Sequence, residues 1–266
     1  MPDPPPFVDI HCHLLPGLDD GAADWQETLA MARLAVADGI STVVVTPHQL
    51  GASVGNRADT IRALTVQLQE FLHEHHVALR VLPGADVRIE PDLVQRIQSG
   101  EVLTLADRRR HVLLELPHDV CFPLDSLLAG LKAAGMVGIL SHPERNLRIL
   151  AQGDLLHPLV HAGCLLQVTA GALVGTFGSR VMKFSQSLVR RGFVHFVATD
   201  AHGAKTRRPL LRRAFKQVAA LAGYPTAVDL CCGNPALVLS GGTILRRHVE
   251  PKESRVAGWL RRKKAG

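Results

Sequence analysis

The chain has 266 residues, of which 47% are hydrophobic and 4% aromatic, so it can form one large domain with an aliphatic core. Its formal net charge is +6, but residues 252–266 carry six basic side chains against the single Glu253, which leaves about +1 for the rest. The near-neutral body disfavours nucleic-acid binding, and the basic tail is interpreted as a solvated end. The alternative for the tail is weak contact with an anionic membrane surface, because Trp259 and Leu260 stand beside its arginines.

The composition also points to a compartment. Residues 1–7 are acidic and proline-rich, with neither the basic nor the apolar region of a signal peptide, and the chain has no run of eighteen apolar residues. The five cysteines show no Cys-x-x-Cys spacing and are an odd number. We therefore expect reduced thiols and a cytoplasmic protein.

Short apolar runs alternate with helix-length stretches along the chain. Strands are expected at residues 7–10, 42–46, 79–82, 111–115, 137–140, 165–169 and 194–198. The first helix follows a capping-box pattern, Asp24 with Glu27, and ends before Gly39. Further helices are expected at about residues 57–75, 91–98, 123–134, 155–163, 181–191 and 210–221.

This alternation predicts parallel strands linked by crossover helices, that is, an α/β fold. Seven such units fit a barrel better than an open sheet, although the sequence leaves closure of the barrel open. With no repeat and no linker, one domain is expected over residues 1–251, followed by the basic tail, residues 252–266.

Histidines and carboxylates follow six of the seven expected strands. They are His11 and His13, Asp20 in a turn after the first strand, His48, Asp86, Glu115, His142, Asp200 and His202. Because active sites of parallel barrels lie at the carboxyl ends of the strands, these side chains are expected to converge. Imidazole with carboxylate suits Mn, Fe or Zn, and nine ligands imply two or three ions. Such clusters can clamp a phosphate and activate water.

Other residues receive different interpretations. Asp19 is read as a turn cap, and Asp9 as a residue that orients a ligand histidine. The remaining histidines on expected helices or chain ends are read as surface residues: His73, His75, His76, His157, His161 and His248. His111 and His195 begin strands and should lie at the opposite end of the barrel, and His118 is left undecided.

Two arginines stand close in sequence to these ligands. Arg145 follows His142 by three residues, and Arg207 follows Asp200 by seven. The guanidinium fork matches phosphate oxygens, so both are candidate phosphate-binding residues, with Arg208 as the alternative to Arg207.

Five motifs now suggest a family. Asp9-Ile-His-Cys-His13, Asp19-Asp-Gly21, Thr46-Pro-His48, Ser141-His-Pro-Glu-Arg145 and Thr199-Asp-Ala-His202 resemble the polymerase and histidinol phosphatase (PHP) superfamily. Within it, the chain is similar to the bacterial manganese-dependent protein-tyrosine phosphatases of capsule and exopolysaccharide loci, over about residues 8–235. The resemblance implies a distorted (β/α)7 TIM-like barrel, the PHP fold.

The resemblance also implies a ligand set for three metal ions, often manganese. His11, His13 and Asp200 would hold the first ion, and Glu115 and His142 the second, with Asp86 bridging the two. Asp20, His48 and His202 would hold the third ion, while Arg145 and Arg207 would grip the phosphoryl group. The family usually has glutamate where this chain has Asp86, a side chain shorter by about 1.5 Å.

The implied function is hydrolysis of phosphotyrosine, typically on a bacterial tyrosine kinase that regulates polysaccharide export. The alternatives are a phosphoesterase for histidinol phosphate or another small molecule, and a non-catalytic metal-binding regulatory protein. The second alternative rests on Asp86 alone. A nuclease is disfavoured by the near-neutral body.

Overall fold

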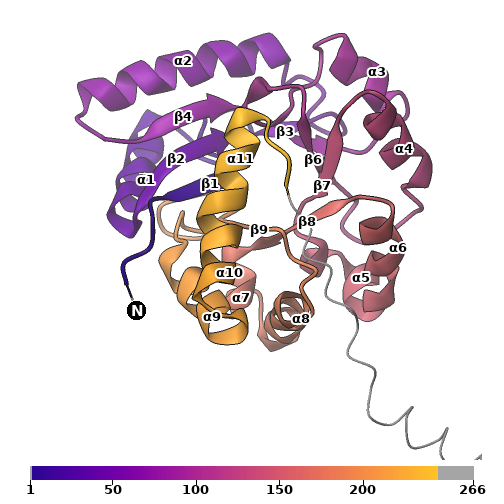
Figure 1. Cartoon of the computed structure of the whole chain (residues 1–266). Coiled ribbons are helices and arrows are strands. Elements are labelled where there is room, and N and C mark those ends of the chain that lie inside the picture. Colours follow the sequence, from indigo (N-terminus) through magenta and orange to yellow (C-terminus); the bar gives the residue numbers. More distant parts are fainter. Residues whose placement is uncertain (1, 245–266) are drawn as a thin grey trace, which may run out of the picture.

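A computed structural model describes residues 2–244 of the chain (Figure 1). Its strands are β1 (Phe7–Cys12), β2 (Ile40–Val45), β3 (His48–Gln49), β4 (Arg80–Pro83), β5 (Asp86–Arg88), β6 (His111–Glu115), β7 (Val137–Leu140), β8 (Leu165–Thr169) and β9 (Phe196–Ala198). All pairings between these strands are parallel. All seven expected strands are present.

The strands form a curled, barrel-like sheet. One sheet has the order β1-β2-β4, and the other has the order β3-β5-β6-β7-β8-β9. Two short strands were not expected from the sequence: β3 follows β2 after Thr46-Pro47, and β5 follows β4 after Gly84-Ala85. Beyond β9 the chain returns to β1, because the amide of Asp200 donates to the carbonyl of His11 at 2.8 Å and Cys12 bridges Ala201. The predicted barrel is thereby confirmed.

Helices cover the outside of this sheet (Figure 1). They are α1 (Trp25–Asp38), α2 (Ala58–Glu74), α3 (Leu93–Gln98), α4 (Asp125–Ala133), α5 (Leu147–Ala151), α6 (Leu156–His161), α7 (Ala170–Leu173), α8 (Ser179–Arg190), α9 (Arg212–Ala222), α10 (Tyr224–Val228) and α11 (Asn234–Ser240). Short 3₁₀ turns lie at Leu105–Asp107, Pro143–Arg145 and Gly153–Leu155, and a π-helical turn at Asp229–Gly233.

The start and end of α1 follow the predicted chemistry. The side chain of Asp24 accepts from the amide of Glu27 at 2.8 Å, and Gly39 ends the helix with φ 100°. A left-handed residue at this position favours glycine, because it has no Cβ to clash. The sequence did not predict α5, α7, α10 and α11, which are short or follow another helix directly.

The inside of the barrel has two layers. Its lower layer is an apolar cluster that includes Ile10, Leu113 and Phe196, whereas polar side chains lie above it. The register of β1 shifts by one residue between Asp9 and Cys12 relative to β2. This bulge lets Ile10 join the apolar layer while His11, the next residue, joins the polar one, as bulges beside functional sites often do.

Five of the six histidines interpreted as surface residues are exposed, and His248 lies outside the described residues, as do the basic tail and the 251/252 boundary. None of the helices within residues 2–244 has the length and apolar character needed to span a membrane.

His111, at the start of β6, is buried, and burial lowers its pKa to about 4, assisted by Arg110. The unfolded chain takes up this proton near pH 6.5, but the folded chain only near pH 4. The contribution of neutral His111 to folding stability is therefore fully present above pH 6.5, and it is lost as the pH falls from 6.5 toward 4. Between pH 7 and pH 5, we expect the free energy of unfolding to fall by about 2 kcal/mol less in His111→Gln than in wild type. Urea unfolding at both pH values, with wild type in parallel, measures this, and equal losses would contradict it.

Candidate metal centre

His11 and His13 form the floor of the polar layer. The His11 Nδ1–H donates to Gln167 Oε1 at 2.9 Å, which leaves Nε2 as the free acceptor. His11 Nε2 lies 3.3 Å from His13 Nε2 and 3.3 Å from Asp200 Oδ1. His13 Nε2 lies 3.7 Å from the same Asp200 oxygen. The three expected ligands of the first ion therefore present their nitrogen and oxygen atoms to one point.

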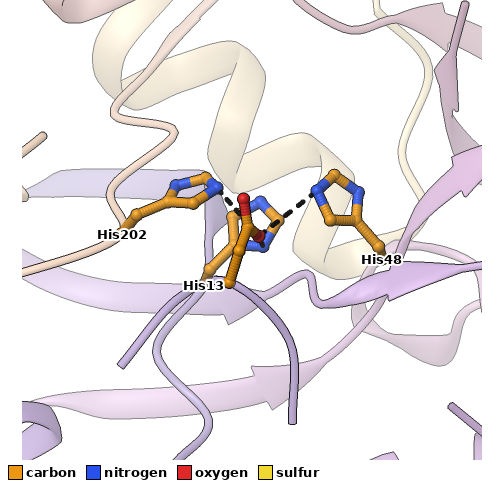
Figure 2. Close-up of side chains that lie close together, drawn as sticks. His13, His48 and His202 are labelled. Carbon is orange, nitrogen blue, oxygen red and sulfur yellow. Dashed lines mark ion pairs between the residues drawn. The ribbon is translucent and has the colours of Figure 1, made fainter. Parts of the chain in front are cut away.

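The turn after β1 orients two histidines. Asp19 Oδ2 accepts from His13 Nδ1 at 2.6 Å and from the backbone amide of His48 at 3.0 Å. Its neighbour Asp20, with a 63% exposed side chain, places Oδ1 3.3 Å from His202 Nε2 and 3.5 Å from His48 Nε2. Asp19 is thus an orienting residue rather than only a turn cap, and Asp20 faces the expected partners. Figure 2 shows His13, His48 and His202 around this carboxylate.

Gly21 allows this turn to lie against β1. A Cβ at Gly21 would stand 2.3 Å from the carbonyl oxygen of His13, so the turn has no room for a side chain. We expect Gly21→Ala to displace Asp19 and Asp20, to destabilise the fold by about 1–3 kcal/mol and to lower metal affinity. Gly55→Ala is the matched control, because a Cβ there has nothing within 4 Å. Thermal unfolding and metal content test this, and two variants with equal values would contradict it.

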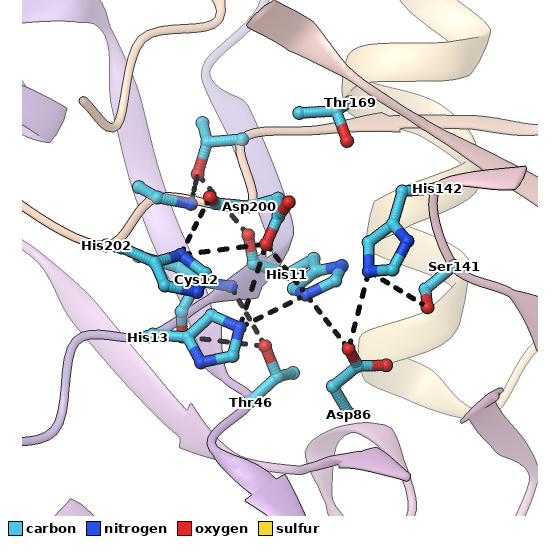
Figure 3. A network of polar contacts seen from close by, with 12 residues as sticks. His11, Cys12, His13, Thr46, Asp86, Ser141, His142, Thr169, Asp200 and His202 are labelled. Carbon is cyan, nitrogen blue, oxygen red and sulfur yellow. Dashed lines mark hydrogen bonds and ion pairs between the residues drawn. The ribbon is translucent and has the colours of Figure 1, made fainter. Parts of the chain in front are cut away.

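Asp86 contacts several of the candidate ligands, and Figure 3 shows its carboxylate facing His11 and His142. Its Oδ2 is 3.5 Å from His11 Nε2 and 3.7 Å from both His48 Nδ1 and His142 Nε2. Glu115 Oε2 lies 3.6 Å from the same His48 nitrogen. Both oxygens of Asp86 are buried, and within the described residues neither has a hydrogen-bond partner. A buried carboxylate without hydrogen bonds is costly unless a cation neutralises it, which fits a metal ligand.

Four groups of these side chains bring their ligand atoms within 4.8 Å of one another. They are His13, Asp20, His48 and His202; His11, His142 and Asp200; His11, His13 and Asp86; and His48, Asp86 and Glu115. All nine residues proposed from the sequence thus converge.

Nearby positive charge lowers the pKa of Asp200 and of Asp86, whereas burial and the charge of Asp86 raise the pKa of Glu115. Burial opposes ionisation of Asp200, but His11, His142 and Arg207 hold its pKa well below the usual range. The pKa of Asp86 is also lowered against burial, by His11 and His142. Burial lowers the pKa of His11 to about 4, so its imidazole is neutral at pH 7. Ionised carboxylates and a neutral imidazole are the protonation states that bind metals.

The Ser141-His-Pro-Glu-Arg145 motif forms one wall of the candidate metal centre. Glu144 is buried, and its Oε1 accepts from the amide of Thr169 at 2.8 Å, which ties the motif to the end of β8. His142 adopts φ 31° and Asp200 φ 51°, conformations that are costly for residues with a side chain. Such strain clusters at functional sites, where the surrounding structure holds it.

A cleft of about 220 Å³ opens above the cluster. Arg145 and Arg207 line it, and both bind Asp200 Oδ2, at 2.5 and 2.6 Å. Two positive charges therefore lie in the cleft next to the candidate ligands. Arg88 and His118 line it too, and Arg88 Nη1 lies 3.5 Å from Glu115 Oε2. The position of the undecided His118 is thereby settled, and Arg88 is a lining residue that the sequence did not reveal.

Two supporting contacts differ from the sequence interpretation. Within residues 2–244, Asp9 accepts from the backbone amides of His11 and Thr199 and from the Thr199 hydroxyl, joining β1 to β9, and not from an imidazole. Gln167 orients His11 in its place. No sequence spacing signals Gln167, because the contact forms only when β8 curls toward β1.

Comparison with known proteins assigns the family. The family model described as capsular polysaccharide synthesis, CpsB/CapC, matches residues 7–240. The chain belongs to this family. It is 36% identical over 250 residues to the tyrosine-protein phosphatase YwqE of Bacillus subtilis, covering 94% of this chain and 98% of that protein. It is 24% identical to the tyrosine-protein phosphatase CpsB of Streptococcus pneumoniae, covering 88% and 98%.

The fold agrees with that assignment. A crystal structure from work on YwqE and CpsB, described as metal-dependent tyrosine phosphatases, superposes with a TM-score of 0.88 at 35% identity, covering 93% of this chain and 100% of that one. The resemblance to capsule-locus phosphatases and the fold class predicted from the sequence are therefore confirmed.

Proposed function

We propose that this CpsB/CapC family member is a metal-dependent protein-tyrosine phosphatase. The observation that carries the proposal is the convergence of five histidines and four carboxylates beneath two arginines in one cleft. The relatives named above are tyrosine-protein phosphatases, and one crystal structure is described as metal-dependent, which supports the same activity here.

The donor set suits manganese, with iron or zinc as alternatives. His11, His13 and Asp200 would hold one ion, and His142 and Glu115 a second, with Asp86 between them; Asp20, His48 and His202 would hold a third. When bound, the ions polarise phosphoryl oxygens and lower the pKa of water. The central place of Asp86 Oδ2 supports its bridging role although the side chain is shorter than glutamate.

The chain's own residues bind and orient the substrate. Arg145 and Arg207 would bind the equatorial phosphoryl oxygens and stabilise their charge in the transition state. The Arg145 guanidinium lies 4.8 Å over the Phe177 ring, and its contact with Asp200 fixes its position further. Asp19 and Gln167 hold the rings of His13 and His11 in the tautomers that face the cleft.

The proposed substrate is a phosphotyrosine protein, namely a bacterial tyrosine kinase that regulates capsule or exopolysaccharide synthesis, and the proposed compartment is the cytoplasm. Free thiols at Cys12, Cys121, Cys231 and Cys232 support a reducing compartment. The family description supports the capsule connection.

The test compares kcat/KM for a phosphotyrosine peptide, the matching phosphoserine peptide and histidinol phosphate, with Mn²⁺ present. We expect the phosphotyrosine peptide to exceed the other two by at least about 100-fold, since a site built for one leaving group discriminates strongly. A preference for histidinol phosphate would instead support the small-molecule phosphoesterase.

A further inference from the structure

Two exposed aliphatic side chains lie on neighbouring loops that follow β6 and β7. Val120, in the loop between β6 and α4, is 46% exposed, and Leu147, the first residue of α5, is 52% exposed. Single aliphatic residues are often exposed on protein surfaces and need no explanation. These two, called the aliphatic pair below, differ because the loops that carry them are joined to each other and to the cleft.

Asn146 joins the two loops. Its side chain is buried, and its Nδ2 donates to the carbonyl of Val120 at 2.8 Å and to that of Pro117 at 2.7 Å. Its Oδ1 accepts from the backbone of α5 and caps that helix. The amide of Leu147 also donates to the carbonyl of His118, at 2.9 Å. These bonds hold the loop after β6 against the start of α5, so the aliphatic pair is in place before any substrate binds.

The aliphatic pair adjoins the cleft above the metal-ligand cluster. Asn146 and His118, which connect the two loops, both line that cleft. Leu116 and Pro143 line it as well and add apolar surface. Arg145, the candidate phosphate-binding residue, directly precedes Asn146 in the chain. A substrate whose phosphoryl group contacts Arg145 would therefore leave the cleft beside the aliphatic pair.

The exposed charges around the pair have opposite signs. Asp119 directly precedes Val120, Arg148 directly follows Leu147, and both charged residues are exposed. One negative and one positive charge leave no net charge that would select an acidic or a basic side chain of a substrate. Apolar contact is then the property by which this surface can discriminate between substrates.

We propose that the aliphatic pair determines specificity by binding an apolar side chain of the substrate protein, within a few residues of its phosphotyrosine. This inference rests on the proposed function and narrows its class of substrate. Contact with such a side chain removes apolar surface from water, and loops already held in place lower the entropic cost of binding. A small phosphate monoester has no such side chain, so only peptides and proteins gain affinity from this surface.

The experiment measures kcat and KM of the full chain, with Mn²⁺ present, for two phosphotyrosine peptides and for p-nitrophenyl phosphate. The peptides differ only beside the phosphotyrosine, where one has leucines and the other has serines. We expect wild type to favour the leucine peptide by about tenfold in kcat/KM, mainly through a lower KM. Val120→Ser/Leu147→Ser should abolish that preference, while kcat/KM for the serine peptide and for p-nitrophenyl phosphate stays within about twofold of wild type. Val120→Thr, which keeps the shape of the side chain, should reduce the preference to about threefold.

The matched control is Val66→Ser/Leu237→Ser, which removes an exposed valine from α2 and an exposed leucine from α11, both outside the cleft lining. It should keep the tenfold preference of wild type, about as large as before the change. Thermal unfolding and bound metal per chain verify that each variant is folded and loaded.

Equal kcat/KM of wild type for the two peptides, or an unchanged preference in Val120→Ser/Leu147→Ser, would overturn the inference. An equal loss on all three substrates in that variant would also overturn it, because it would assign the pair a structural role. These outcomes leave the proposed function intact. If wild type hydrolysed none of the three substrates, the proposed function itself would fail, and this inference with it.

Discussion

Arg145→Ala is expected to lower phosphatase turnover by about 100- to 1000-fold while leaving the bound metal unchanged. Arg145 reaches the cleft from the 3₁₀ turn Pro143–Arg145 and touches Asp200 by its outer oxygen, Oδ2, not by the oxygen that faces the histidines. Its loss would remove a charged hydrogen-bond donor to the phosphoryl group. One such donor typically stabilises the transition state enough to raise turnover by about 100- to 1000-fold. Metal analysis and steady-state kinetics on a phosphotyrosine peptide measure both quantities.

Arg148→Ala is the matched control, since it removes an exposed arginine three residues later in α5. It should keep turnover within about twofold of wild type, as exposed substitutions away from a site normally do. Near-normal turnover in Arg145→Ala would remove this arginine from the mechanism. Loss of metal in that variant would show that it supports Asp200 rather than the phosphoryl group.

Asp86→Asn should lower both bound metal and turnover, the latter by at least about 100-fold. The change keeps the shape of the side chain but removes the charge that faces His11, His48 and His142. The proposed bridging position would need an anion, and an amide binds these cations far more weakly. Inductively coupled plasma analysis of metal per chain, with kinetics on the same preparations, tests the prediction.

Asp86→Glu is the conservative partner of that variant. It introduces the glutamate that the resemblance implies at this position and keeps the charge. We therefore expect it to retain metal and activity within about tenfold, since the cost depends on how the site accommodates one more methylene. If Asp86→Asn were as active and as metal-rich as wild type, Asp86 would not be a ligand. An inactive Asp86→Glu would show that the site is fitted to the shorter side chain.

Much of this site could be predicted because its candidate ligands follow the strands. The carboxyl ends of parallel strands meet at one end of a barrel, so polar residues after six strands had to converge, and His11 and His13 lie on one face as alternation requires. The local backbone geometry could not be predicted from the sequence. The break between β4 and β5 places Asp86 at the start of a strand, and Gly84 permits it, since a Cβ there would stand 2.7 Å from Val44 Cγ1.

Contacts between distant strands could not be predicted either. Gln167 and Arg88 have no motif around them, and their roles arise only from the curl that brings β8 to β1 and the end of β5 to the cleft. Asp9 is expected from the sequence to orient a ligand histidine, but at the bulge in β1 its side chain turns toward Thr199 instead. A bulge reverses the regular alternation of side chains along a strand, and the sequence gives no signal of where the extra residue is inserted.

The most direct test of the metal centre is titration of Mn²⁺ into chelated protein, with bound ions per chain and phosphate release from a phosphotyrosine peptide measured on the same samples. The site predicts no activity in EDTA, binding of two or three ions per chain, and recovery of activity as these ions bind. Full activity in EDTA, or fewer than two ions bound when activity is complete, would contradict a multi-metal phosphatase built from these nine residues.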